Sequence, residues 1–227
     1  MAKQTISLAE QMYHGKARYA PLLGENGRTG VPVSVLTKCA LGSPAAADVD
    51  GFCASQDLTA AGVASVNTTA AGAIAAAGLA GANGTARNVV AAWTGTAIIT
   101  ITGKDEYDET MSEASGSGTS FTGKKAFYTV TNIAVSGNVT SLTVGQGVLY
   151  GLPYFLTDLS DLVSCTFNGV IDATPSGIVG VTTVATTTTG DTRGTVALSA
   201  PDGSAVVVWM HIQGTDIKED LVGVTQA

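Results

Sequence analysis

The chain has 227 residues, of which 45% are hydrophobic and 13% are charged, and its formal net charge is −7. Its 11 lysines and arginines are scattered singly apart from Lys124–Lys125, so it lacks the clustered cations with which proteins neutralise nucleic-acid phosphates. No apolar run reaches the about 20 residues of a bilayer-spanning helix. We therefore expect no nucleic-acid partner and no membrane partner, and apolar surface that other proteins cover.

The N-terminal region, residues 1–30, is polar and mixed in composition. Ser7–Glu10 matches a capping box and Gly15 follows it, which predicts at most a short helix. The region lacks the apolar segment and the small-residue cleavage site of a signal peptide, so we expect no secretion. A strand is predicted next, over Val31–Thr37.

Three cysteines, Cys39, Cys53 and Cys165, show no C-x-x-C spacing. An odd number fits a reduced cytosolic environment better than a disulfide framework. A disulfide between Cys39 and Cys53 stays open as an alternative, and buried unpaired thiols are the favoured interpretation.

The stretch from Leu58 to Ala86 carries no charge and is rich in alanine and glycine. Glycine at this density disfavours a helix, so we expect irregular chain that lies against a partner or is flexible. Residues 1–92 are therefore predicted to form an N-terminal arm and an irregular Ala/Gly/Thr-rich region that contacts neighbours.

From Trp93 onward, short β-branched runs alternate with turn residues, which is typical of an all-β domain. Thr96–Thr102 places Ala97, Ile99 and Ile101 on one face, and Gly103–Lys104 is expected to end that strand. Thr195–Ala200 and Ala205–Ile212 flank Pro201–Ser204, which predicts a hairpin, with Val206, Val208, Met210 and Ile212 sharing a face. Further strands are expected over residues 125–135, 148–156, 162–171 and 178–183. Residues 93–227 are thus predicted to form an antiparallel β-sandwich or jelly-roll-like domain.

The octet GTSFTGKK, residues 118–125, has the G-x-x-x-x-G-K spacing of a phosphate-binding loop. That loop needs a Ser or Thr after the lysine and then a helix N-terminus. Here Lys125 takes the hydroxyl position, and the strand-like run AFYTVTNIAV follows. We interpret the octet as a Gly/Ser loop that enters a strand, and expect no nucleotide cofactor.

The acidic stretch Asp105–Glu109, with Glu113 beyond it, suggests calcium binding or glycoside hydrolysis. It lacks the spacing of an EF-hand loop, as does Asp48–Gly51, and no aromatic cluster for stacking a sugar lies nearby. A solvated hairpin is the favoured interpretation, because charge runs usually face water. Whether Asp105–Glu113 binds a metal ion is left open.

Other chemistry-bearing residues give no recognisable site. His14 and His211 are the two histidines, and neither belongs to a zinc motif. A nucleophile elbow is absent, so we expect no enzyme and no catalytic, cofactor-binding or metal-binding residues. The main aromatic residues are expected to pack in the core rather than to line a sugar-binding face; they are Trp93, Tyr150, Tyr154, Phe155 and Trp209.

Three blocks of the sequence resemble virion structural proteins of tailed bacteriophages. Residues 86–133 contain RNVV with TGTA, then ITG-D-Y, then TGKKAF-TVT, and GVLYGLPYFL (147–156) and TTTTGDTRGTV (186–196) resemble later blocks of the same group. The resemblance implies a head decoration, cement or related auxiliary capsid protein, and it carries over no catalytic residue.

This resemblance implies a non-enzymatic function in the virion, after assembly in the host cytoplasm. We expect the major capsid protein and other copies of the chain as partners, with a homotrimer suited to local three-fold points of a shell. The alternative is a tail- or head-fibre module that recognises a host surface glycan. A nucleotide-hydrolysing or glycan-cleaving enzyme is the third hypothesis.

Overall fold

The computed structural model describes residues 35–67, 85–105, 109–154, 161–173 and 194–212. Their regular structure consists of β-strands that pair antiparallel, which confirms the all-β prediction. The strands are β1 Val35–Gly42, β2 Asp48–Leu58, β3 Gly62–Val63, β4 Arg87–Ala97, β5 Ile99–Lys104, β6 Thr110–Ala114, β7 Gly118–Phe127, β8 Thr129–Val135, β9 Val139–Gly151, β10 Leu162–Phe167, β11 Val170–Ile171, β12 Thr195–Ala197 and β13 Val206–Ile212. A search of these residues finds no helix of the length and apolarity needed to cross a membrane.

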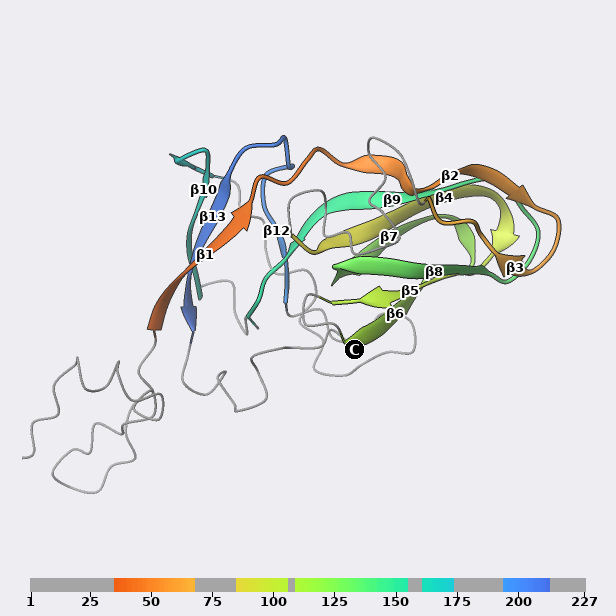
Figure 1. The fold of residues 1–227 in the computed structure, drawn as a ribbon, viewed down its shortest axis with the longest axis horizontal. Helices are drawn as coiled ribbons and strands as arrows, with labels where there is room; N and C mark the ends of the chain where they lie inside the picture. Colours follow the sequence, from red (N-terminus) through yellow and green to blue (C-terminus); the bar gives the residue numbers. More distant parts are fainter. Residues whose placement is uncertain (1–34, 68–84, 106–108, 155–160, 174–193, 213–227) are drawn as a thin grey trace, which may run out of the picture.

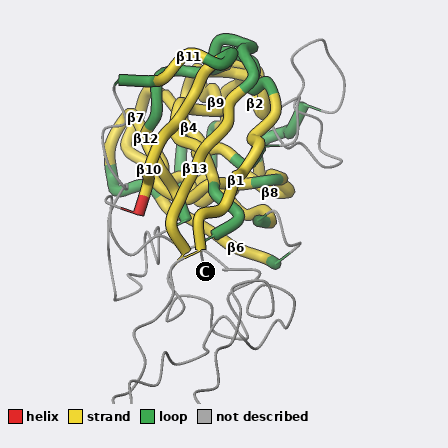
Figure 2. The backbone as a smooth tube through the Cα atoms, turned by 90° about the vertical axis from the view of Figure 1, so that its left-hand side faces the viewer, coloured by secondary structure: helices red, strands yellow, loops and turns green. Residues whose placement is uncertain are grey.

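The strands form three sheets, two of which stack as a sandwich. One layer has the order β12-β9-β4-β7, with β2 also paired to β9, and the other has the order β3-β8-β5-β6. Figure 1 shows these two layers one above the other. The third sheet, β1-β13-β10-β11, lies beside them and faces the viewer in Figure 2. We call it the distal sheet.

Two hydrophobic cores follow from this arrangement. The sandwich core is formed by alternating residues of facing strands, such as Val89 and Trp93 of β4 against Ile99 and Ile101 of β5. The second core lies behind the distal sheet, where the strands contribute Leu41, Cys165, Val206, Val208 and Met210. Because successive side chains of a strand point to opposite faces, the alternating apolar residues of these strands lie inside in both cores.

Strand β9 belongs to both cores. It is 13 residues long, and Val139, Leu142 and Val144 near its start pack in the sandwich core. Tyr150 near its end is fully buried in the second core. One continuous strand thus runs from the sandwich core into the second core, behind the distal sheet.

The predicted hairpin at Pro201–Ser204 is wrong. Strand β12 pairs with β9, whereas β13 pairs with β1 and β10, so the connecting segment carries the chain from one sheet to another. The hairpin lies instead at Asn168–Gly169, where β10 turns into β11 through two residues with φ of 48° and 81°. Positive φ at both positions is the signature of a tight turn that matches the twist of the strands.

Two of the predicted strands also differ from the structure. Gly103 and Lys104 remain in β5 and pair with β6 and β8. Glycine permits the close approach of β8, since a Cβ at Gly103 would lie 1.9 Å from the carbonyl oxygen of Thr129. The predicted strand 125–135 is divided at Tyr128 into β7 and β8, which lie in different layers.

The pairing also bears on the expected division between residues 92 and 93. That division falls inside β4, and β1 and β2 pair with later strands, so the β domain extends back to Val35. The predicted helix at 7–15 and the predicted strand at 178–183 lie outside the described residues, as does most of the Ala/Gly-rich stretch.

Candidate functional site

The octet 118–125 forms part of strand β7 and not a loop, which corrects the expectation from sequence. The backbone N–H of Lys124 donates to both carboxylate oxygens of Glu113, at 2.9 and 3.1 Å, and the N–H of Lys125 donates to Oε2 at 3.1 Å. The amide groups that suggested a phosphate cradle are therefore bonded to a carboxylate of the same chain.

Gly123 makes this approach feasible. A Cβ at this position would lie 2.8 Å from Oε2 of Glu113 and 2.9 Å from the carbonyl oxygen of Val89. Both contacts are shorter than a carbon atom tolerates, so the glycine before the lysines serves internal packing. Burial raises the pKa of Glu113, and the N–H groups of Lys124 and Lys125 partly offset that rise.

The described residues of the acidic stretch are Asp105, Glu109 and Glu113, which lie on or beside the paired strands β5 and β6, and two of them are not solvated. Asp105 is 4% exposed and Glu113 is 2% exposed, whereas Glu109 lies at the surface. Oδ1 of Asp105 accepts a hydrogen bond from the N–H of Glu109 at 3.0 Å. The prediction of a solvated hairpin is therefore wrong for Asp105 and Glu113, whose carboxylates are used to hold backbone.

Arg87 is the largest fully buried side chain among the described residues, and nothing in the sequence predicted its burial. Its guanidinium donates to the carbonyl oxygen of Ala45 at 2.7 Å and to that of Gly147, and it lies 5.8 Å from the ring centroid of Tyr150. Burial lowers the pKa of Arg87 to about 10, so the side chain stays protonated at neutral pH.

Arg87 is one of several groups that fix the connection between β1 and β2. The N–H of Gly203 donates to the carbonyl of Pro44 at 2.9 Å, and the side-chain amide of Gln146 donates to that of Ala46 at 3.4 Å. Since this connection passes from the distal sheet to the sandwich, these bonds hold the two parts together. We therefore assign Arg87 a structural role, which is to hold the β1–β2 connection against β9.

Cys39, Cys53 and Cys165 are not disulfide-bonded, so the alternative of a Cys39–Cys53 disulfide is wrong in this structure. Trp93 and Tyr150 are buried, as predicted, whereas Tyr154 and Trp209 are half-buried. His211 lies on β13, on the same face as Trp209. His14 and Phe155 lie outside the described residues.

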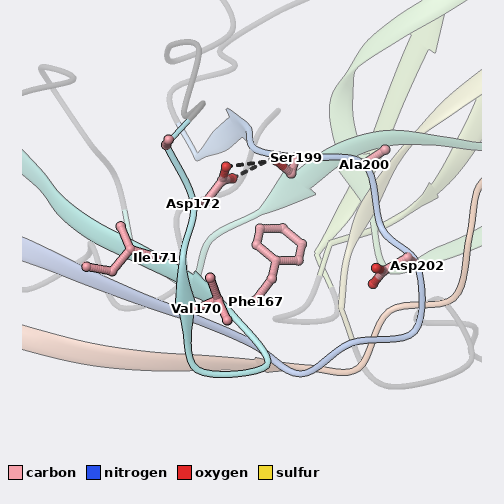
Figure 3. Close-up of a pocket in the computed structure, with 8 residues that line it drawn as sticks. Phe167, Val170, Ile171, Asp172, Ser199, Ala200 and Asp202 are labelled. Carbon is pink, nitrogen blue, oxygen red and sulfur yellow. Dashed lines mark hydrogen bonds between the residues drawn. The ribbon is translucent and has the colours of Figure 1, made fainter.

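A shallow pocket of about 330 Å³ opens at the edge of the distal sheet, between the β10–β11 hairpin and the segment 199–202. Its lining residues are Phe167, Val170, Ile171, Asp172, Ala173, Ser199, Ala200 and Asp202. Figure 3 shows the Phe167 ring between the Asp172–Ser199 pair and Asp202. This pocket is the candidate site.

Hydrogen bonds to the core fix one wall of the pocket. The Ser199 hydroxyl donates to Oδ1 of Asp172 at 2.7 Å, and the Ser199 N–H donates to Oδ2 at 2.9 Å. The Tyr150 hydroxyl donates to the Ser199 carbonyl at 3.1 Å, and the Tyr150 and Phe167 rings meet edge to face at 6.4 Å. No sequence pattern identified this pocket, because its two sides come from segments about 30 residues apart.

Comparison of the chain with family models, curated proteins and solved structures finds no match. Within the described part of the chain, no group of three or more His, Cys, Asp and Glu residues is arranged to hold a metal ion.

Proposed function

We propose that this protein is a non-enzymatic structural component of a tailed-phage particle, which binds the outer capsid surface and stabilises the shell as a decoration protein. The proposal rests on the sequence resemblance, and the distal sheet supports it by offering a surface for partners. The expected partners are the major capsid protein and further copies of the chain, as a trimer on a local three-fold axis.

The structural observation that best supports the proposal is the position of the exposed apolar side chains. Eight large hydrophobic residues are exposed in the described part of the chain, and four belong to the distal sheet: Leu36, Val163, Val170 and Ile171. The face of β13 that carries Val207, Trp209 and His211 is only half-buried. The strand register places Leu36 and Ile171 on this same face, beside Lys38, Ser164 and Thr166. A surface that mixes apolar and polar side chains in this way suits attachment to a protein shell.

The buried polar side chains are consistent with a structural role. The most buried charged groups, Arg87 and Glu113, are bonded to backbone atoms of the same chain. The alternative function, recognition of a host glycan, requires aromatic side chains lining a groove. Trp93 and Tyr150 are buried in the cores, and the described lining of the pocket holds a single aromatic residue, Phe167.

The test is electron microscopy of the particle that carries this protein. We expect density for the chain at symmetric positions over the shell, with the distal sheet toward the capsid. Density confined to the tail would overturn the proposal, and binding on a glycan array would favour the alternative.

A matched pair of variants tests the surface. Leu36→Ser on the distal sheet should weaken attachment to particles that lack the protein. Val63→Ser should leave attachment unchanged, because Val63 is more exposed than Leu36 (64% against 50%) but lies on the sandwich. Equal attachment of both variants would contradict a role for the distal sheet.

A further inference from the structure

We infer that the pocket beside the β10–β11 hairpin is a docking site for a partner protein segment that presents an arginine or lysine side chain. The inference deepens the proposed function, and naming the capsid surface as the source of that segment rests on it. The chemistry of the pocket stands on the geometry alone.

The apolar half of the site comes from the hairpin. Phe167 and Val170 are directly opposite each other in the β10–β11 register, and Val170 is 71% exposed. The tight turn at Asn168–Gly169 keeps them in place, while Phe167 rests against Tyr150 in the second core. An apolar side chain held at the surface in this way gains free energy when a partner covers it.

The polar half is acidic. Among the described residues that line the pocket, Asp172 and Asp202 are the two that carry a charge, and none is a lysine or an arginine. The chain as a whole carries a net charge of −7, so its surroundings favour a cation rather than an anion.

The carboxylate of Asp202 is exposed and held in position, because its Oδ1 accepts the N–H of Ser204 at 2.9 Å. That hydrogen bond lowers the pKa of Asp202, so the group is ionised at neutral pH. Asp172, by contrast, has both oxygens bonded to Ser199 and forms the fixed wall. Asp202 is therefore the group that would meet the incoming charge.

These two halves select the occupant. Arginine and lysine carry an apolar stem and a charged head, so one side chain can cover Phe167 while its head reaches Asp202. The volume of about 330 Å³ suits a side chain or two rather than a large ligand. The edge of β11 away from β10 pairs with no other described strand, so an extended partner segment can also add main-chain bonds there.

The first experiment uses small probes and the intact chain. Pentylguanidinium, its neutral analogue pentylurea and the anion hexanoate are titrated while backbone amide shifts are followed by NMR. We expect saturable shifts at Phe167, Val170 and Ser199 with pentylguanidinium, binding several-fold weaker with pentylurea, and no binding with hexanoate. Equal binding of all three, or shifts scattered over the acidic surface, would overturn the inference.

Matched variants locate the effect. Asp202→Asn keeps the oxygen that bonds Ser204 but removes the charge, and it should weaken pentylguanidinium binding several-fold. Asp50→Asn, at another exposed carboxylate, should not. Val170→Ser should weaken binding and Val63→Ser should not, because the two valines are similarly exposed in different sheets. Unchanged affinity of both pocket variants contradicts the inference.

The same variants separate the inference from the proposed function. Particles that bind the wild type and both pocket variants equally would leave the capsid proposal standing and remove the pocket from it. Probe binding at the pocket without any attachment to particles would do the reverse, and would keep the docking chemistry while overturning the capsid as its source.

Discussion

The carboxylate of Glu113 on β6 lies 2.9 Å from the backbone nitrogen of Lys124 on β7. A side chain of one layer is thus hydrogen-bonded to the backbone of the opposite layer. Lys125 adds a second N–H at 3.1 Å and its ammonium donates to the carbonyl of Ser112 at 2.9 Å. This contact links the two layers at their edge by charge-assisted bonds.

Removing that carboxylate should destabilise the fold. Glu113→Ala leaves the N–H groups of Lys124 and Lys125 buried without an acceptor, at a cost of about 1–3 kcal/mol in the free energy of unfolding. Urea denaturation monitored by tryptophan fluorescence measures it. Glu109→Ala is the control, since Glu109 is exposed, and it should change stability by no more than about 0.5 kcal/mol. Equal effects of the two would refute the role of the contact.

Stability should depend on the ionisation of Glu113. Burial raises its pKa in the folded state, so the folded state holds the proton more tightly than the unfolded state does. The free energy of unfolding that Glu113 contributes therefore falls as pH rises above about 4.3, the ordinary glutamate value, and levels off above the folded pKa.

Glu113→Gln isolates this effect, because the amide does not titrate. The difference in unfolding free energy, wild type minus Glu113→Gln, should decrease with pH across that window and be constant below it. Denaturation series at several pH values measure the difference. A difference that grows with pH would show that the N–H bonds outweigh burial.

Arg87 should be among the most sensitive positions. Arg87→Met keeps much of the side-chain volume but leaves the carbonyl groups of Ala45 and Gly147 without their donor and removes the contact with Tyr150. We expect a loss of about 2–4 kcal/mol, from unsatisfied buried groups and the lost cation–π contact. Arg87→Lys should restore little, because one ammonium cannot reproduce the planar fork. A lysine variant as stable as the wild type would contradict this assignment.

Gly116 and Gly123, which lie on either side of the start of β7, should respond differently to replacement by alanine. Gly123→Ala pushes a Cβ against Glu113 and the Val89 carbonyl, and strain of this kind costs about 1–3 kcal/mol. Gly116→Ala meets nothing within 4 Å and should be neutral or slightly stabilising. Thermal denaturation of both variants measures the difference. Similar melting temperatures for Gly123→Ala and Gly116→Ala would contradict the prediction.

The thiols should differ in reactivity. Burial raises the pKa of Cys53, and raises that of Cys165 to about 12, so neither forms much thiolate at pH 8. Cys39 is half-buried, so it should react first with a thiol reagent, and the other two only as the chain unfolds. Cys39→Ser should then remove the fast phase. Fast labelling of Cys165 in the native state would contradict this order.

Strand character was predictable from sequence, whereas strand partners were not. Alternation placed Ile99 and Ile101 inside correctly, since it reports which face is buried whatever the neighbour. Pro201–Ser204 predicts a change of direction, but local chemistry does not say which sheet the next strand joins. Asn168–Gly169 carried the stronger hairpin signal, within a segment predicted as one strand over 162–171.

The candidate pocket and the buried charges show a second limit. Arg87 and Glu113 are buried because backbone groups from distant strands bond to them, and the sequence around each gives no sign of those partners. The octet 118–125 illustrates the same point. Its glycine and lysines fit a phosphate loop by spacing, yet their N–H groups meet a carboxylate that the chain itself supplies.

The pairing of β1 with β13 has a consequence for the order of events during synthesis. Val35 pairs with Ile212, so the first described strand waits for the last one. At about 5–20 residues per second, that interval is roughly 10 to 35 s, during which the one described strand that pairs with β1 is not yet made. Leu41 and its neighbours are then exposed to solvent or to chaperones, so among the described sheets the distal sheet is the one for which slow translation carries the greatest risk of aggregation.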